Sequence, residues 1–289
     1  MRILCALICV SLLLFPALSQ AVTRATVEAV QSPAWLERDG RLLPLATGAK
    51  LQDGDEVVTG VDSRAYIRLA DSSLVKLGEN ATFTMRGMRQ DEGIFRAALQ
   101  VLQGAFRFTT DTIQRSRIRR EVTVRFGTVT AGVRGTDLWG RNFGEREVVV
   151  LIEGQITVTR DGETPVLMQK PLTYYEAPRV GDASVQAIPL DLLQEYAAET
   201  ELQPGRGALV PGGRWRLVVA SYDDQDSALK LYDSLRRDGY PATIYPQPAD
   251  TDHIYYVRLS GFASRDEAAA IGARLREIHP GVEPFATMR

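Results

Sequence analysis

Arginine and tyrosine side chains recur at alternate positions in the last quarter of the chain. Successive residues of a β-strand point to opposite faces of the sheet, so such alternation separates an apolar face from a polar one. The residues predicted to face a core are Leu217, Val219, Val257 and Leu259. On the other face, tyrosine rings can pack against flat ligands, and guanidinium groups can donate to hydroxyl or carboxylate oxygens. The predicted binding residues are Arg216, Val218, Ser221, Tyr222, Thr243, Tyr245, Tyr256, Arg258 and Ser260.

A second polar cluster follows an alternating segment in the middle of the chain and consists of Arg134, Gly135, Thr136 and Asp137. Gly135 can adopt the positive φ of a turn. The Thr136 and Asp137 side chains can bond to nearby backbone, and Arg134 can pair with Asp137 or bind exposed carbonyl groups. A structural role is the first interpretation of this motif, and contact with a partner protein is the alternative.

Residues suited to catalysis are few. The histidines, His253 and His279, lack the spacing of a metal site. The cysteines, Cys5 and Cys9, both lie in an apolar run at the N-terminus. Nucleophile-elbow, phosphate-loop and dinucleotide-binding motifs are absent from the sequence, whereas a glycosidase-like pair of carboxylates stays open because acidic residues are many. We therefore expect no enzymatic activity, no cofactor and no metal site.

The elements that carry the tyrosines and arginines have a definite order. Strands are predicted at 217–220, 242–245, 254–259 and 282–286. The first helix between them is capped by Asp223 or Asp224, and the second begins at a capping box formed by Ser264 and Glu267. The order strand, helix, strand, strand, helix, strand predicts a small four-stranded sheet with two helices on one face.

The preceding region reads as many short strands. Segments 65–69 and 122–126 alternate in polarity, and 148–152 is continuously apolar, as in a strand buried on both faces. Turn residues recur between such segments, which predicts an all-β domain built as a sandwich, a barrel or a solenoid. The predicted regions are a signal peptide at 1–21, the all-β domain at 22–185 with its main motifs at 55–160, a linker with a short helix at 186–213, and the small α/β domain at 214–289.

The N-terminus is typical of a secretory signal peptide. Arg2 precedes an apolar run over residues 3–14, and Ser19 and Ala21 place small residues at positions −3 and −1 of a cut after Ala21. The run is shorter than a bilayer span requires. We expect a periplasmic protein that has no cysteine and no transmembrane segment after cleavage.

The formal net charge of −2 gives no reason to expect nucleic acid or an anionic membrane as a partner. A local group of arginines is the exception. We interpret it as a solvated strand face or loop, with a functional basic patch as the alternative; its members are Arg115, Arg117, Arg119 and Arg120.

Residues 214–289 resemble a SPOR domain, the sporulation-related repeat of bacterial division and cell-wall proteins. The residues that carry the resemblance are Ser221-Tyr222, Ala228, Leu235, Gly239-Tyr240-Pro241-Ala242, Tyr256-Val257-Arg258-Leu259, Gly261-Phe262 and Ser264-Arg265-Asp266-Glu267-Ala268. The resemblance implies binding to peptidoglycan glycan strands, with a preference for strands stripped of their stem peptides. Val218 and Ala220 stand where many members have Gln and Gly, which puts a sugar contact by that Gln in doubt.

Residues 55–160 resemble a FecR-type periplasmic domain. The resemblance is carried by Val57-Val58-Thr59-Gly60, Ser63, the segment 67–73, Leu77-Gly78, the segment 128–137 and the strand from Val148 to Glu153-Gly154. FecR proteins relay a signal from outer-membrane transporters to a cytoplasmic sigma factor. A cleavable signal peptide stands here in place of their cytoplasmic segment and membrane anchor, so the sigma-factor role does not follow from the shared module.

Together these features predict a non-enzymatic periplasmic protein of the cell wall or division machinery. Its SPOR domain would dock on glycan strands, and its FecR-like domain would act as a scaffold or bind a second envelope protein. The alternative is an envelope sensor of FecR type that the SPOR domain localises, and a cell-wall hydrolase is the third class.

Cleavage of the signal peptide should leave a mature chain that begins at Val22 and is recovered from the periplasm. The physical reason is the short apolar run followed by the small residues Ser19 and Ala21. Intact-mass measurement of protein purified from a periplasmic extract checks this expectation. A membrane-bound species that retains Met1 would contradict it.

Overall fold

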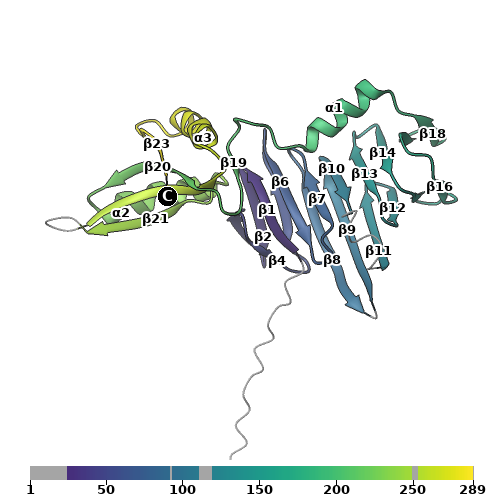
Figure 1. Cartoon of the computed structure of the whole chain (residues 1–289), viewed down its shortest axis with the longest axis horizontal. Coiled ribbons are helices and arrows are strands. Elements are labelled where there is room, and N and C mark those ends of the chain that lie inside the picture. The colour runs from purple at the N-terminus through teal and green to yellow at the C-terminus, as the bar shows by residue number, and fades with distance from the viewer. Residues whose placement is uncertain (1–24, 92, 111–118, 249–252, 289) are drawn as a thin grey trace, which may run out of the picture.

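The computed structural model describes residues 25–91, 93–110, 119–248 and 253–288 (Figure 1). The predicted signal peptide lies outside the described residues, as do Arg115 and Arg117 of the arginine cluster. None of the helices within these ranges has the length and apolarity to cross a membrane.

Strands β1 to β18 build two sheets that enclose one apolar core, so the all-β region is a sandwich. The first sheet contains, in spatial order, β18 (Ser184–Ala187), β17 (Thr173–Pro178), β14 (Arg146–Glu153), β13 (Asp137–Asn142), β10 (Ala105–Thr109), β7 (Leu74–Leu77), β6 (Arg64–Leu69) and β1 (Ala25–Gln31), with β4 (Lys50–Leu51) beside β1. The second contains β16 (Val166–Met168), β15 (Ile156–Arg160), β12 (Val129–Val133), β11 (Arg119–Phe126), β9 (Ile94–Gln103), β8 (Thr82–Asp91), β5 (Glu56–Thr59), β2 (Ala34–Arg38) and β3 (Arg41–Pro44). Figure 1 shows these strands following one another along the long axis of the molecule.

The sandwich core follows from the alternation in the sequence. Along β11, buried and exposed residues alternate without a break, and Val122, Val124 and Phe126 enter the core. Arg120 also points inward, where its Nε lies 2.6 Å from Asp71 Oδ2. The interpretation of the arginine cluster as solvated is therefore wrong for Arg120, because a buried carboxylate on the opposite sheet compensates its charge.

Helix α1 (Leu190–Thr200) covers the outer face of the first sheet. The ring of Tyr196 stacks on Trp139 of β13, with centroids 4.2 Å apart and planes 5° apart. This contact belongs to a second apolar cluster that includes Val148 and Val150. The continuously apolar strand β14 is thus buried on both faces, as the sequence predicted, because a helix covers the face turned away from the sandwich core.

The C-terminal region has the predicted order of elements. Its strands lie in the order β21 (Thr243–Pro248), β22 (His253–Phe262), β20 (Trp215–Tyr222) and β23 (Phe285–Met288), all antiparallel to their neighbours. Helices α2 (Gln225–Arg237) and α3 (Arg265–Ile278) pack on one face of this sheet. Asp224 caps α2 by accepting a 2.8 Å hydrogen bond from Ser227 N. The predicted inward residues Leu217, Val219, Val257 and Leu259 all lie in the core between sheet and helices.

A short strand, β19 (Ala208–Leu209), joins the two regions. It pairs with β1 on one side and with the end of β22 on the other, so one hydrogen-bonded sheet of fourteen described strands runs through both. The carboxylate of Glu267, on α3, accepts hydrogen bonds from the backbone N–H groups of Gly205 (2.8 Å), Gly207 (2.6 Å) and Ala208 (2.8 Å). Glu267 therefore holds the chain that leads into β19.

The capping box predicted at α3 forms in one direction only. Ser264 Oγ accepts from Glu267 N at 3.2 Å, as expected of an N-cap. The Glu267 side chain leaves the helix and is 8% exposed, with its oxygens on the linker backbone instead. A buried carboxylate needs such donors, because burial without them costs several kcal/mol.

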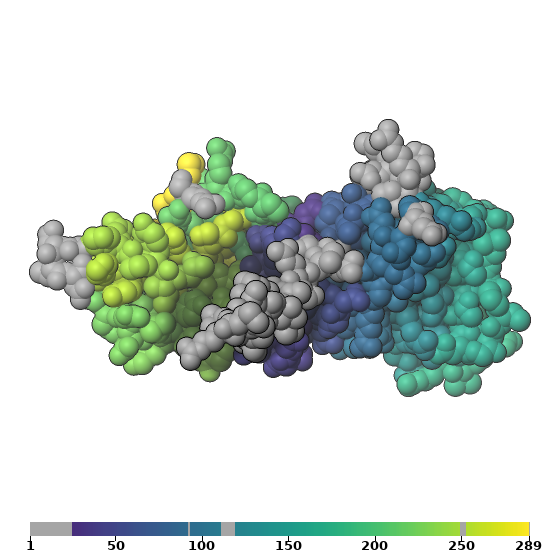
Figure 2. All heavy atoms as spheres, turned by 90° about the horizontal axis from the view of Figure 1, so that it is seen from below, coloured from purple at the N-terminus to yellow at the C-terminus, as the bar shows by residue number. Residues whose placement is uncertain are grey.

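The two regions also touch directly. Trp35 Nε1 on β2 donates to Arg237 O at 3.0 Å, and Arg274 Nη1 on α3 donates to Ser32 O at 2.8 Å. A Cβ on Gly239, whose φ is +81°, would lie 2.7 Å from the Trp35 ring, so the backbone at the end of α2 lies directly against this ring. Figure 2 shows the green and yellow C-terminal region abutting the purple N-terminal strands.

Replacing Glu267 by Ala should lower the free energy of unfolding by at least about 3 kcal/mol. Three buried N–H groups would lose a charged acceptor, and each such hydrogen bond is worth about 1.5–3 kcal/mol. Urea titration of the mature chain followed by circular dichroism measures the change. Glu277→Ala, at an exposed position of the same helix, is the matched control and should change stability by no more than about 0.5 kcal/mol. Equal effects of the two substitutions would contradict the role assigned to Glu267.

Candidate functional site

The helix-free face of the C-terminal sheet gathers most of the predicted binding residues. Strand register places Thr243, Arg258, Val218 and Phe285 in one row across the four strands. A second row contains Tyr245, Tyr256 and Ser221, and a third contains Ser260, Arg216 and Thr287. Paired residues of neighbouring strands share a face, so these side chains form one surface.

Aromatic and guanidinium groups dominate this surface. Tyr245 is 45% exposed and Phe285 is 55% exposed. The guanidinium carbon of Arg258 lies 4.1 Å from the centroid of the Tyr245 ring, a cation–π contact that holds both groups in place. The sheet face thus offers flat apolar surface beside hydrogen-bond donors, which is a combination suited to binding and does not by itself provide catalysis.

Tyr222 lies apart from the other predicted residues. It pairs with Tyr255, and both pack partly against the core on the helix side. The reason is a β-bulge between Val218 and Ala220, which shifts the alternation by one residue. Beyond the bulge, Ser221 is therefore on the open face and Tyr222 on the helix side.

Two residues of the open face were missed by the sequence reasoning, namely Phe285 and Thr287. Their strand was placed near 282–286 without assigning its faces. The available signal was alternation around Ala286, which packs against the core on the helix side. An aromatic residue at the position before Ala286 has to point to the open face.

The Arg134–Asp137 motif lies where the chain crosses from the second sheet to the first, between β12 and β13. Gly135 has a φ of +70°, as predicted for a turn. Thr136 Oγ1 donates to Gln155 O at 3.0 Å, and Thr110 N donates to Thr136 O at 3.1 Å. A Cβ on Gly154 would lie 2.5 Å from Gly135 O, so the Glu-Gly turn after β14 packs directly against the crossover.

Asp137 pairs with Arg107 and not with Arg134. Arg107 donates to its carboxylate from Nε at 2.9 Å and from Nη2 at 2.6 Å, and donates a further bond of 3.0 Å to Glu201 just beyond α1. Glu201 also accepts from Lys76 Nζ at 2.6 Å and from Tyr66 Oη at 2.8 Å. Burial alone would raise the pKa of Glu201, but the Lys76 and Tyr66 hydrogen bonds outweigh it, and the net pKa is lowered. The motif is thereby tied to the end of α1.

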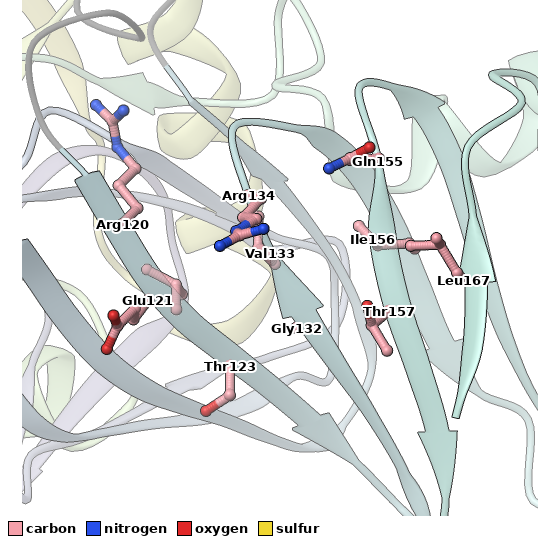
Figure 3. Close-up of a pocket in the computed structure, with 11 residues that line it drawn as sticks. Arg120, Glu121, Thr123, Gly132, Val133, Arg134, Gln155, Ile156, Thr157 and Leu167 are labelled. Atoms are coloured by element: carbon pink, nitrogen blue, oxygen red, sulfur yellow. The ribbon is translucent and has the colours of Figure 1, made fainter. Parts of the chain in front are cut away.

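Arg134 is exposed and lies over a shallow groove of about 400 Å³ on the outer face of the second sheet. Figure 3 shows Arg134 and Gln155 at one end, Thr123 of β11 on one side and Leu167 of β16 on the other. Gly132 lies between β11 and β15, and because it has no side chain the outer face is hollow there. The groove is open and has mixed polarity, which suits contact with a polypeptide.

Among the described residues, no group of three or more histidine, cysteine or carboxylate side chains is arranged to hold a metal ion. The two surfaces described above, one on a small sheet and one on a sandwich, define a binding protein built from two modules. Family models identify these modules. Residues 55–157 match the FecR protein family and residues 211–286 match the SPOR domain family. The chain thus joins a FecR-type domain to a C-terminal SPOR domain, as the sequence resemblances predicted.

The two families carry functional meaning at a coarse level. A SPOR domain implies peptidoglycan binding and a location in the cell envelope, and a FecR domain implies envelope signalling. Both are binding or signalling domains and neither is a catalytic domain.

Solved structures give weaker similarities. A crystal structure at 2.50 Å, described as an anti-sigma factor from Parabacteroides distasonis, has 14% identity and a TM-score of 0.40, covering 77% of this chain and 90% of that chain. A second structure with the same description, at 1.65 Å, has 12% identity and a TM-score of 0.37, covering 70% of this chain and 98% of that chain. Curated proteins include no match.

Glu201→Gln should destabilise the chain at pH 7, and this difference should shrink as the pH falls below about 4.5, the ordinary pKa of the group. The folded-state pKa is lowered, so the ionised carboxylate stabilises the fold above the unfolded-state pKa, and that contribution is lost as the folded form protonates. Urea titrations across pH 3–7 check the trend. Glu145→Gln, at an exposed carboxylate, is the control and should show no such pH dependence. A Glu201→Gln difference that stays constant with pH would contradict the assigned network.

Proposed function

We propose that this chain is a non-enzymatic periplasmic protein that binds peptidoglycan glycan strands through the open face of its SPOR sheet. The observation that carries the proposal is the helix-free surface bearing Tyr245, Tyr256, Arg258 and Phe285. Exposed aromatic side chains add little to the stability of the sheet, whereas a sugar ring can bury them.

The chemistry of the surface favours glycan strands that are poor in stem peptides. Removal of the stem peptides uncovers the carboxylate of each lactyl group. Guanidinium groups such as those of Arg216 and Arg258 bind carboxylates with charge-assisted hydrogen bonds. Aromatic rings beside them would contact the apolar faces of the sugars.

The FecR-like sandwich then acts as the second binding module. The groove beside Arg134 supports contact with another envelope protein, because it is exposed and lies at the rigid crossover between the sheets. The same groove supports the second candidate function, an envelope sensor in which the SPOR domain only localises the sandwich. A transcriptional response to loss of the gene favours the sensor, and unchanged transcription favours the scaffold.

Tyr245→Ala should weaken binding of the mature chain to amidase-treated peptidoglycan sacculi about tenfold. Burial of an aromatic side chain contributes roughly 1.5–3 kcal/mol, and 1.4 kcal/mol corresponds to a factor of ten. Cosedimentation with sacculi at a series of protein concentrations measures the affinity, and thermal melting checks the fold. Leu229→Ala, on the exposed side of α2, is the control and should bind as the wild type does. A wild-type chain that stays wholly in the supernatant with treated sacculi would overturn the proposed function.

A further inference from the structure

A hollow of about 300 Å³ lies where the open face of the SPOR sheet meets the sandwich. Arg216, Arg258 and Ser260 line it from β20 and β22, and the turn at residues 210–213 lines it from the linker. Thr47 and Gly48, from the segment between β3 and β4, complete the lining. The hollow is therefore shared by the FecR-like half and the SPOR half of the chain.

Close backbone packing builds one wall of this hollow. A Cβ on Gly213 would lie 2.1 Å from Gly261 O, so only glycine fits at that position. Val210 N donates to Gly261 O at 2.8 Å and fixes the turn against β22. The Thr47 hydroxyl lies 3.8 Å from the Cβ position of Gly261, so the sandwich reaches the same point. The site is preformed by three segments from different parts of the chain.

The chemistry of the lining favours an anion. Arg216 and Arg258 both face the hollow, and no acidic side chain occurs among the described residues that line it. The Nε of Arg216 is buried and has no hydrogen-bond partner in the described part of the chain. A buried donor without a partner is costly, and a ligand oxygen would satisfy it. Paired guanidinium groups match the geometry of a carboxylate.

We propose that this hollow is the carboxylate subsite of the glycan-binding face and takes the lactyl carboxylate of a muramyl residue that has lost its stem peptide. The inference rests on the proposed function and makes it more specific. The Arg216 guanidinium binds the carboxylate, Arg258 adds positive charge beside Tyr245, and the Thr47 hydroxyl donates from the sandwich. The FecR-like half is thus part of the glycan site, and the preference for stripped strands requires both halves.

Carboxylates in sacculi have two sources, the stem peptides and the lactyl groups. Three preparations separate them: untreated sacculi, amidase-treated sacculi, and amidase-treated sacculi whose carboxylates have been converted to methylamides. The mature wild-type chain should bind treated sacculi best and should lose about tenfold in affinity when their carboxylates are blocked. Equal wild-type affinity for treated and blocked sacculi would overturn the subsite. Tightest binding to untreated sacculi would assign the hollow to stem-peptide carboxylates and would also overturn it.

Variants at the hollow test the residues. Arg216→Gln should bind treated sacculi about tenfold more weakly than the wild type and should be insensitive to carboxylate blocking. Arg216→Lys, which keeps the charge but loses the planar fork, should fall between the two. Thr47→Val, on the sandwich, should lower affinity for treated sacculi a few-fold with an unchanged melting temperature. This variant keeps the test valid if the Arg216 variants fail to fold.

The outcomes separate this inference from the proposed function. Wild-type binding that Tyr245→Ala weakens, with Arg216→Gln and Thr47→Val binding as the wild type, would leave the sheet face in place and overturn the shared subsite. The same loss for Arg216→Gln on treated and blocked sacculi would also overturn it, because the lost contact would then not involve a carboxylate. Absence of wild-type binding to every preparation would overturn the proposed function itself.

Discussion

One buried carboxylate determines how the two halves of this chain are joined. Glu267 accepts hydrogen bonds from three backbone N–H groups of the linker, while Ser264 caps the helix from which it projects. A buried carboxylate and buried N–H groups each require partners, so neither side can separate without a large loss of free energy. The chain held in this way forms β19, and β19 pairs with both β1 and β22. A sandwich and a small sheet thereby become one continuous hydrogen-bonded structure.

Polar contacts hold the chain that enters this junction along most of its length. Arg107 links Asp137 of the crossover motif to Glu201, and the Tyr66 hydroxyl binds Leu202 N. Gln31 then exchanges hydrogen bonds with Gln203, with its Nε2 donating to the carbonyl at 2.6 Å. The motif near the groove and the junction near the SPOR sheet are therefore ends of one network. A protein docked on the wall through its sheet would present the groove in a defined orientation.

The binding surfaces and the core use the same residue types for opposite purposes. Tyr196 and Trp139 stack in the interior and stabilise α1 on the sandwich, whereas Tyr245 and Phe285 stay exposed on a face that no helix covers. Arg120 is buried against Asp71 and supports the fold, while Arg216 retains a donor without a partner at the edge of a hollow. Side chains left exposed or unpaired on a rigid sheet are the ones available to a ligand.

The sequence by itself determined the two modules, the order of their elements and most of the open face, because alternation and capping are local signals. It predicted the inward residues of β20 and β22 and the double burial of β14, since these depend only on the polarity of successive residues. Tertiary structure decided the rest. The bulge after Val218 reversed the alternation and moved Tyr222 to the helix side, because an extra residue in one strand depends on pairing with its neighbour. The partners of Asp137 and Glu267, and the approach of Thr47 to the SPOR sheet, involve residues far apart in sequence, so only the folded chain could bring them together.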